Sequence, residues 1–429
     1  MDKRKYARHV SIVMLGTIVA QAVNLLSYPL IARTYAPPEF GIFAIFVTVT
    51  AVPGIISCWR LELTIPNVGK RTFVSAYQLA VFASAISGLL ACLFAFVASF
   101  LTSESWPAGI SLLIGLAVFL TGFCAASTML LLRLEQYRAT ASGVVIRTTC
   151  AVAAQLALGL LWQDAMGLIL GYCVGFGMQG AVLAWNVSRA HVWQPPSRRG
   201  MLALLKRYRR QIAIDVPSAM IGSLSVNLTP PLVALLFGTG RAGIYAIAAR
   251  LAILPMQVFT EALGQVFFQR AAKAYQERGT FWPEYRFNMI SSGAISAFVV
   301  LAICLFAPPL AHLYLGAEWA ETGQALVWIS PMIGLMSLSM ALATSVFVLK
   351  KVHWLLFLNI ATICGQLLAF ALSYFLALDF LPTLAILSVN LGLVYLVFVI
   401  ILTLRVRASA APSGSPASSS GVPVIRSDA

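Results

Sequence analysis

Charge is what this sequence has least of. Only 10% of its 429 residues are charged, whereas soluble domains carry about a quarter. Hydrophobic residues make up 60% of the chain, and a soluble fold of this size has no interior large enough to hide that much apolar surface. A lipid bilayer can solvate it. The composition therefore excludes a soluble enzyme and predicts a polytopic membrane protein.

Most signatures of enzymes and of metal sites are also missing. The chain has four histidines and seven cysteines, and no two cysteines form a CxxC pair. It contains no HExxH, GxSxG or phosphate-binding-loop motif, so nothing indicates metalloprotease, serine-hydrolase or ATPase chemistry in this chain. We therefore expect no catalytic residue and no metal ligand, and a protein that is not an enzyme.

Long apolar runs stand in place of charge. A helix needs about 20 residues to cross a bilayer, and none of the runs shows the alternation of a membrane strand. The runs cover residues 10–32, 41–59, 73–101, 108–132, 142–162, 165–187, 212–237, 243–263, 288–314, 323–349, 355–378 and 383–404. The sequence thus predicts an all-α integral membrane protein with about twelve transmembrane helices.

The basic residues between these runs predict the orientation. The net charge of +15 would suit nucleic acid, but the Lys and Arg residues gather in short loops and form no basic face. With a cytoplasmic N-terminus, 26 of the 29 fall on the cytoplasmic side, Arg147 among them. The positive-inside rule therefore predicts a bacterial inner-membrane protein with cytoplasmic N- and C-termini, and no nucleic-acid partner.

An internal repeat divides the chain. Residues 29–53 match residues 231–255 at eight ungapped positions, and the matches include two prolines and a glycine. Two like lobes in the same orientation would be related by a pseudo-two-fold axis along the membrane normal, as in alternating-access carriers. We expect a six-helix lobe over 1–187, a basic cytoplasmic linker over 188–211, a second six-helix lobe over 212–404 and a disordered cytoplasmic tail over 405–429.

Arg250 is the charge that lies deepest in an apolar run. It follows Gly243, the start of its run, by seven residues, or about 10 Å along a helix. If it faced lipid it would cost roughly 2.5–3.5 kcal/mol on insertion scales. It should therefore face a wet cavity or extend to the outer headgroups, and the residues leave both open. In a cavity it would suit an anionic substrate such as a pyrophosphate, because guanidinium binds phosphate oxygens in pairs.

Other polar residues in the runs are few. Asn24 and Asn227 fall near equivalent positions of the two halves, where they would line a cavity or bond across helices. Glu62 and Glu261 lie near cytoplasmic ends, as coupling residues or as headgroup-level carboxylates. No carboxylate lies near the middle of a run, which argues against coupling to a cation at mid-membrane.

Three segments carry a family resemblance. They are GTIVAQ at 16–21 followed by YPLIARTYAPPEFGIFA at 28–44, RLEL at 60–63, and GIYA at 243–246 with Arg250. They resemble polysaccharide repeat-unit flippases of the Wzx-like type, which share the MATE-like (MOP) exporter superfamily with drug exporters and lipid II flippases. The resemblance is good over about 50 residues, and elsewhere it rests on helix number, two lobes and short loops.

The resemblance implies export of undecaprenyl-pyrophosphate-linked oligosaccharide repeat units to the periplasmic leaflet, for O-antigen, capsule or exopolysaccharide. It implies cavity cations, a role that we carry over to Arg33, Arg60 and Arg250. It requires no cofactor and leaves open coupling to a proton or sodium gradient. The implied partners are membrane lipids and the lipid-linked oligosaccharide, with room for a polysaccharide polymerase and a chain-length regulator.

Two other functions stay open. A cation-coupled drug or metabolite exporter of the same fold would need a mid-membrane carboxylate. An integral membrane glycosyltransferase or polymerase would need a large outer loop or a pair of outer carboxylates, but the predicted outer loops are short. A sugar transporter of the major facilitator type has the same helix count, but its basic loop signature is missing from residues 63–71.

Overall fold

The computed structural model describes residues 3–69, 72–101, 108–190 and 198–408, and within these ranges it contains helices and no strand. The first half comprises α1 (Lys3–Thr34), α2 (Pro37–Ile56), the 3₁₀ helix η1 (Leu61–Thr64), α3 (Phe73–Leu101), α4 (Ala108–Arg133), α5 (Tyr137–Leu161) and α6 (Ala165–Arg189). The second half comprises α7 (Arg198–Asn227), α8 (Thr229–Arg278), α9 (Trp282–Leu315), the 3₁₀ helix η2 (Ala317–Trp319), α10 (Ala320–Ala343), α11 (Ser345–Val348), α12 (His353–Phe375) and α13 (Phe380–Ala408).

The helices have the length that a membrane requires. Eleven described segments are long and apolar enough to cross a bilayer, and one of them, Arg199–Gln257, has 59 residues, which is room for two crossings. That segment is interrupted at Gly238, where φ is 84° and ψ is 169°. Glycine adopts this backbone freely because it has no Cβ. The predicted all-α fold with about twelve spans is confirmed, and the break lies between the predicted runs 212–237 and 243–263.

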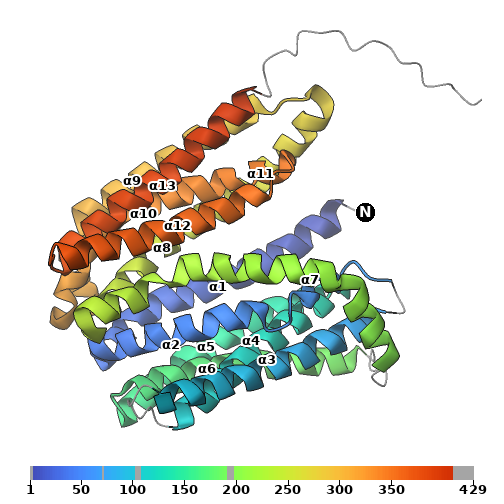
Figure 1. Ribbon diagram of the computed structural model, residues 1–429, viewed down its shortest axis with the longest axis horizontal. Coiled ribbons are helices and arrows are strands. Elements are labelled where there is room, and N and C mark those ends of the chain that lie inside the picture. Colours follow the sequence, from blue (N-terminus) through green and yellow to red (C-terminus); the bar gives the residue numbers. More distant parts are fainter. Residues whose placement is uncertain (1–2, 70–71, 102–107, 191–197, 409–429) are drawn as a thin grey trace, which may run out of the picture.

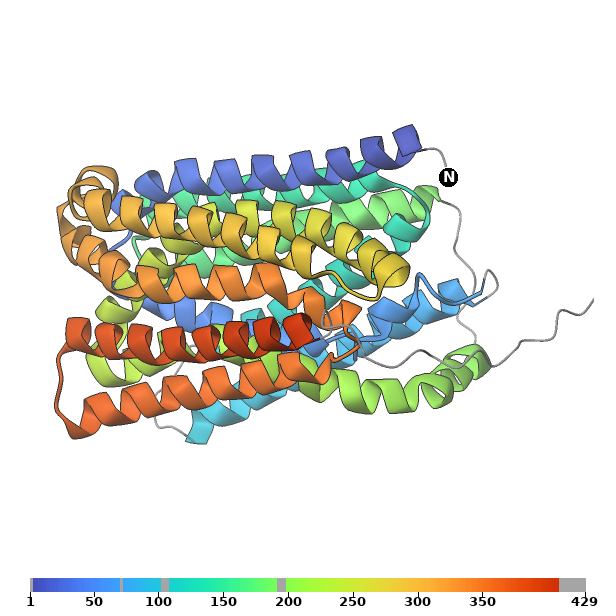
Figure 2. The same ribbon diagram turned by 90° about the horizontal axis from the view of Figure 1, so that it is seen from above.

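Two groups of helices run roughly along one common direction (Figure 1). Helices α1 to α6 form one group, with α7 along it, and α8 to α13 form the other. The groups approach each other at the end opposite the N-terminus and separate toward the end where the N-terminus lies. Figure 2 shows the same common direction from above, and α9 contacts α1 near their ends at Leu313 and Arg33, which joins the two groups there. The arrangement is consistent with a pair of lobes.

The predicted linker is partly helical. Helix α7 begins at Arg198, so the stretch 198–211 forms its first turns, continuous with the membrane-spanning part. Residues 191–197 and the predicted tail from 409 onward lie outside the described residues, and residues 405–408 complete α13. The division into lobes at these positions stays a prediction.

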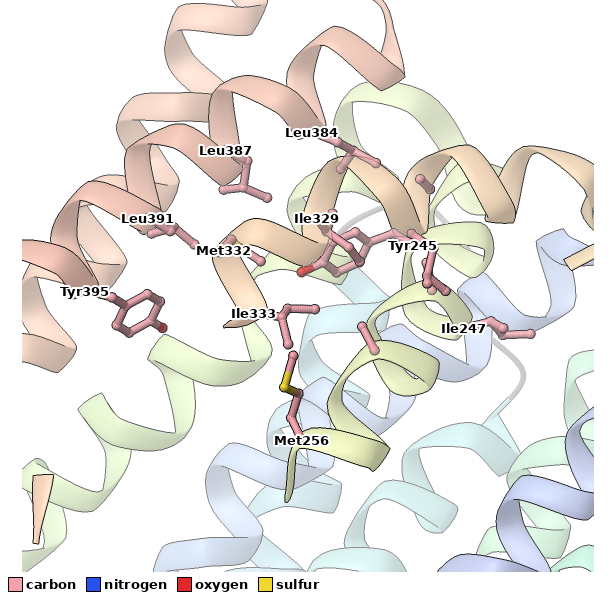
Figure 3. Close-up of a cluster of buried hydrophobic side chains, with 14 of the residues drawn as sticks. Tyr245, Ile247, Met256, Ile329, Met332, Ile333, Leu384, Leu387, Leu391 and Tyr395 are labelled. Atoms are coloured by element: carbon pink, nitrogen blue, oxygen red, sulfur yellow. The ribbon is translucent and has the colours of Figure 1, made fainter. Parts of the chain in front are cut away.

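Buried apolar clusters hold each group together. In the second half, Tyr245 and Met256 of α8 lie beside Ile329 and Ile333 of α10 and Leu387 of α13 (Figure 3). Lipid tails are as apolar as these side chains, so close van der Waals packing stabilises the contact more than removal from water does. The second half is therefore a tightly packed body around α8, α10 and α13.

Helix α2 ends before its apolar run does. After Ile56 the chain turns and continues as η1, so the predicted helix over 41–59 is too long at its end. Trp59 and Arg60 have φ of 52° and 59°, a left-handed conformation that costs non-glycine residues roughly 1–2 kcal/mol each. The Cys58 thiol donates to the Gly122 carbonyl of α4 at 3.1 Å, which helps to fix the turn. We call residues 57–68 the α2 turn.

Candidate functional site

The two halves approach most closely where α2 and the long part of α8 begin. A Cβ atom at Gly41 would overlap the Thr239 carbonyl oxygen, and a Cβ atom at Gly243 would overlap the Pro37 carbonyl oxygen. Gly41 and Gly243 are equivalent in the repeat, and so are Pro37 and Thr239. The crossing is therefore self-complementary, as contacts around a two-fold axis are. Only glycine at both positions lets the backbones come this close.

Further contacts close the same end. The Trp319 indole N–H donates to the Ala32 carbonyl at 2.8 Å, and its ring packs edge-on against Phe40 with centroids 5.1 Å apart. Arg33, predicted as a cavity cation, is exposed here and donates to the Leu313 carbonyl at 3.3 Å. We call the glycine crossing together with these contacts the closed end. Its position ties Arg33 to closure of this end.

Arg147 is a deep cation that the loop pattern concealed. It lies ten residues after Tyr137, the start of α5, which is about 15 Å along the helix. Its guanidinium lies over the Phe176 ring of α6 at 4.9 Å from the centroid, a favourable cation–π geometry. Its assignment to a cytoplasmic loop is therefore wrong. The signal was available, because Arg147 falls inside the apolar run 142–162.

Arg250 reaches the same region from the other half. It follows the break at Gly238 by twelve residues, about 18 Å along α8 and deeper than the 10 Å expected from the sequence. Its side chain is exposed and forms no ion pair within the described part of the chain. It lies within electrostatic range of Arg147 and Tyr172. Because both belong to the first half, Arg250 faces the space between the halves.

These side chains form one site. The Tyr172 hydroxyl lies near Thr50 of α2 and within electrostatic range of both arginines. We call Arg147, Arg250, Tyr172 and Thr50 the cationic site. Its two guanidinium groups repel each other across the halves, and a multivalent oxyanion between them would relieve that repulsion. Planar guanidinium groups match the geometry of phosphate and carboxylate oxygens.

Arg60 and Glu62 lie apart from the cationic site, in the α2 turn. Arg60 Nη1 is 3.4 Å from Glu62 Oε1, while Arg60 Nε and Glu62 Oε2 are buried without a hydrogen-bond partner. Burial raises the pKa of the Glu62 carboxyl above its ordinary value, and the carboxylate of Asp215 in α7 adds to the rise. A backbone hydrogen bond and the Arg60 guanidinium oppose it. The strained turn holds this pair in place, and strain of this kind gathers at functional positions.

The hydrogen bonds of Asn227 and Asn24 go to other parts of the structure. The Asn227 amide donates within its own helix at 2.9 Å, and its carbonyl accepts from the Thr48 hydroxyl of α2 at 3.1 Å, so it links the two halves. Asn24 is half-buried on α1, where its carbonyl accepts from Ser27 at 2.9 Å. The side chain of Glu261 lies outside the described residues.

An apolar groove of about 600 Å³ lies beside α2. It is bounded by α2, α3, α4 and α7, and its lining includes Val52, Trp59, Leu90, Phe94 and Met220. Trp59, one of the lining residues, belongs to the α2 turn, so the groove extends to that turn. The walls have the character of a site for a hydrocarbon chain.

A family model described as polysaccharide biosynthesis protein matches residues 30–324. This range includes the closed end and both deep arginines. The chain belongs to this family. No curated protein sequence matches.

Solved structures of transporters share the fold. The lipid II flippase MurJ in an inward closed conformation matches with a TM-score of 0.70 and 11% identity, over 92% of this chain and 90% of that chain. An inward-facing multidrug resistance MATE family transporter matches with 0.64 and 15%, over 94% and 99%. A MOP superfamily transporter from Pyrococcus furiosus, with a binding pocket of reverse polarity, matches with 0.62 and 16%, over 94% and 96%. These likenesses show that the chain shares the fold of MATE transporters and of the flippase MurJ.

Proposed function

We propose that the protein flips undecaprenyl-pyrophosphate-linked oligosaccharide repeat units from the cytoplasmic to the periplasmic leaflet, for surface polysaccharide. The cationic site carries the proposal: Arg147 and Arg250 extend from the two halves into one space at similar depth. A pyrophosphate group offers several anionic oxygens, and each guanidinium can bind two of them. The carrier lipid would then be held by the one group common to every repeat unit, whatever its sugars.

Alternating access supplies the movement. The closed end holds the halves together, while they separate toward the N-terminal end (Figure 1). An anion bound between the two arginines removes their repulsion and lets the halves approach on the open side. The glycine crossing must then open, which exposes the site to the opposite face of the membrane. Substrate binding would thus favour the exchange between the two states.

The direction follows from the loop charges. With Arg147 removed from the count, 25 of the 29 Lys and Arg residues still belong by sequence to the N-terminal end, which we infer to be cytoplasmic. Both termini and the open side of the cationic site would then face the cytoplasm of an inner-membrane protein. The apolar groove, which extends to Trp59 of the α2 turn, is a suitable place for the prenyl chain.

An exporter of cationic drugs is the alternative with the same fold. Such a substrate needs a carboxylate in the cavity, whereas the cationic site presents two arginines, which repel a cation. The sign of the charge between the halves therefore favours an anionic substrate.

The test is a gene deletion followed by mass spectrometry of the extracted membrane lipids. Deletion should accumulate prenyl-pyrophosphate-linked oligosaccharide and abolish surface polysaccharide. Wild-type protein should remove the accumulated oligosaccharide and restore the surface polysaccharide, and Arg147→Ala should do neither. Arg207→Ala, which removes an exposed arginine of α7, is the matched control and should complement fully. Unchanged lipid-linked sugars with an intact surface polymer in the deletion strain would overturn the proposal.

A further inference from the structure

Glu62 has an environment that an ionised carboxylate does not favour. Among the described residues it is the one charged residue that is buried, with 6% of its side chain exposed. Its Oε1 is 3.4 Å from Arg60 Nη1, and its Oε2 has no hydrogen-bond partner. A buried carboxylate oxygen without a donor strongly disfavours the charged form, while a bound proton removes the charge.

Few charges surround Glu62. Among the described residues, the titratable and charged groups that interact with it are Cys58 and Arg60 of the α2 turn and Asp215 of α7, and Tyr77 of α3 and Cys124 and Arg133 of α4 belong to the helices packed around the turn. The thiols and the phenol are neutral in the physiological range, and Arg133 donates to the Ile65 carbonyl and lies over the Phe73 ring. Lys70 and Arg71 lie outside the described residues. Arg60 and Asp215 are therefore the charges that act on Glu62, with opposite signs.

Asp215 belongs to the helix that joins the two halves. The first part of α7 packs on the first half, where Leu204 and Ile212 contact the apolar cluster around the α2 turn. Its later part bonds to the second half, where the Ser225 carbonyl accepts from Gln366 of α12 at 2.7 Å. Pro217 lies inside α7 between these parts and removes a helical hydrogen bond, which makes this point easy to bend. Asp215 follows Ile212 by three residues, so it lies near the face of α7 that packs around the α2 turn, within electrostatic range of Glu62.

We propose that Glu62 is a proton-binding site whose charge state controls the packing of α7 against the first half of the protein. With Glu62 ionised, its carboxylate repels Asp215 and loosens the first part of α7. A proton on Oε2 removes the repulsion and turns that oxygen into a hydrogen-bond donor. A proton gradient would then bias the position of α7, and with it the relation between the halves.

A metal cation fits the same place poorly. Within the described residues no three His, Cys, Asp or Glu side chains gather to hold a metal. The third charged group at Glu62 and Asp215 is the Arg60 guanidinium, which repels a cation. Hard cations need a shell of about six oxygen ligands, whereas a proton needs one.

The test is infrared difference spectroscopy of the purified full-length protein in lipid nanodiscs, stepped through pH without substrate. The wild type should show a protonated-carboxyl band that titrates above the ordinary glutamate range, and Glu62→Gln should lose it. Asp215→Asn should move the midpoint to lower pH because it removes a repelling charge. Arg60→Gln should move it to higher pH because it removes an attracting one. Glu277→Gln, at an exposed ion pair with Lys273, should change nothing.

Three outcomes would overturn the site. These are a band that persists in Glu62→Gln, midpoints in Asp215→Asn and Arg60→Gln that fail to move in opposite directions, and a band that sodium removes at constant pH. The last would show a metal cation site. If Glu62→Gln fails to fold, the shifts in Asp215→Asn and Arg60→Gln still test the site. The protection factors of the amides of residues 198–215, which correct for the intrinsic pH dependence of exchange, should fall as pH rises in the wild type and stay constant in Glu62→Gln, and equal profiles would overturn the control of α7.

Only the link to transport rests on the proposed function. If lipid-linked sugars do not accumulate in the deletion strain while the Glu62 band titrates as expected, the substrate is wrong and the proton site stands. If Arg147→Ala abolishes flipping in proteoliposomes but the wild-type rate does not depend on the pH gradient, the proposed substrate is supported and the proposed coupling to protons is wrong.

Discussion

Helices α2 and α8 begin alike and end differently. At the closed end, Gly41 near the start of α2 lies against the Thr239 backbone, and Gly243 near the start of the long part of α8 lies against the Pro37 backbone. Each glycine is followed twelve residues later by a proline. Helix α2 ends three residues after its proline, at Ile56, and gives way to the strained α2 turn. Helix α8 continues past its proline to Arg278. The two helices thus share the closed end, while of the two only α2 leads into a buried polar turn at its other end.

The difference suggests a division of roles. An irregular backbone inside a membrane bundle survives only where neighbours satisfy its polar groups. In the α2 turn, Cys58 bonds to α4, and the Ser57 carbonyl accepts from Ser87 of α3 at 3.0 Å. That arrangement gives the first half a place for a buried charge, whereas the part of α8 after Gly238 continues as helix past the equivalent position.

The largest change in conformation should come from substitutions at the glycine crossing of the closed end. Gly41→Leu and Gly243→Leu would each force a side chain into a backbone, and overpacking of this kind costs about 1–3 kcal/mol, or about 5- to 150-fold in the population of the closed state. Cross-linking yield between cysteines introduced as Arg33→Cys and Leu313→Cys measures closure. Both glycine variants should lower it by similar factors, because the crossing is symmetric.

Gly177→Leu in α6 and Gly293→Leu in α9 are matched controls, because a Cβ atom at either position meets nothing within 4 Å. If Gly41→Leu and Gly243→Leu both kept the wild-type cross-linking yield, the glycine crossing would not control closure. A loss of yield in only one of them would show that the crossing is not symmetric.

A smaller difference should separate the two deep arginines. Arg147→Lys loses the stacking on Phe176, worth about 0.5–2 kcal/mol, in addition to the paired contacts that both arginines offer a phosphate. Binding of undecaprenyl pyrophosphate to the purified protein should therefore fall about 2- to 30-fold further in Arg147→Lys than in Arg250→Lys. In a Phe176→Leu background the excess should vanish, as a double-mutant cycle would show. An excess that persists there would mean that the ring plays no part.

The smallest expected change is in thermal stability, where the α2 turn should respond differently from the turn after α12. Ala377, after α12, is exposed with φ of 49°, so Ala377→Gly should relieve about 1 kcal/mol of strain and raise the thermal midpoint in detergent slightly. Arg60→Gly relieves the same kind of strain but leaves the buried Glu62 without its cation, so the midpoint should fall. Equal gains in both variants would show that the Arg60–Glu62 pair contributes nothing.

The fold class was accessible from the sequence because it depends on a local requirement. A spanning segment must satisfy its own backbone hydrogen bonds and face lipid, so each predicted apolar run corresponds to described helix over most of its length. Even the glycine crossing left a trace, since Gly41 and Gly243 are among the repeat matches. The family resemblance at 28–44 and 60–63 falls on the closed end and the α2 turn.

The site needed the tertiary structure. Whether Arg147 belongs to a loop or a cavity depends on where α5 begins and on which ring of α6 lies beneath the guanidinium, and neither is encoded near Arg147. The early end of α2 depends on partners in α3 and α4. The meeting of Glu62 with Asp215 joins positions 153 residues apart. Composition and periodicity determined that the chain enters the bilayer as helices, because the solvent acts on each segment separately. Packing between distant helices decided which polar groups share a space.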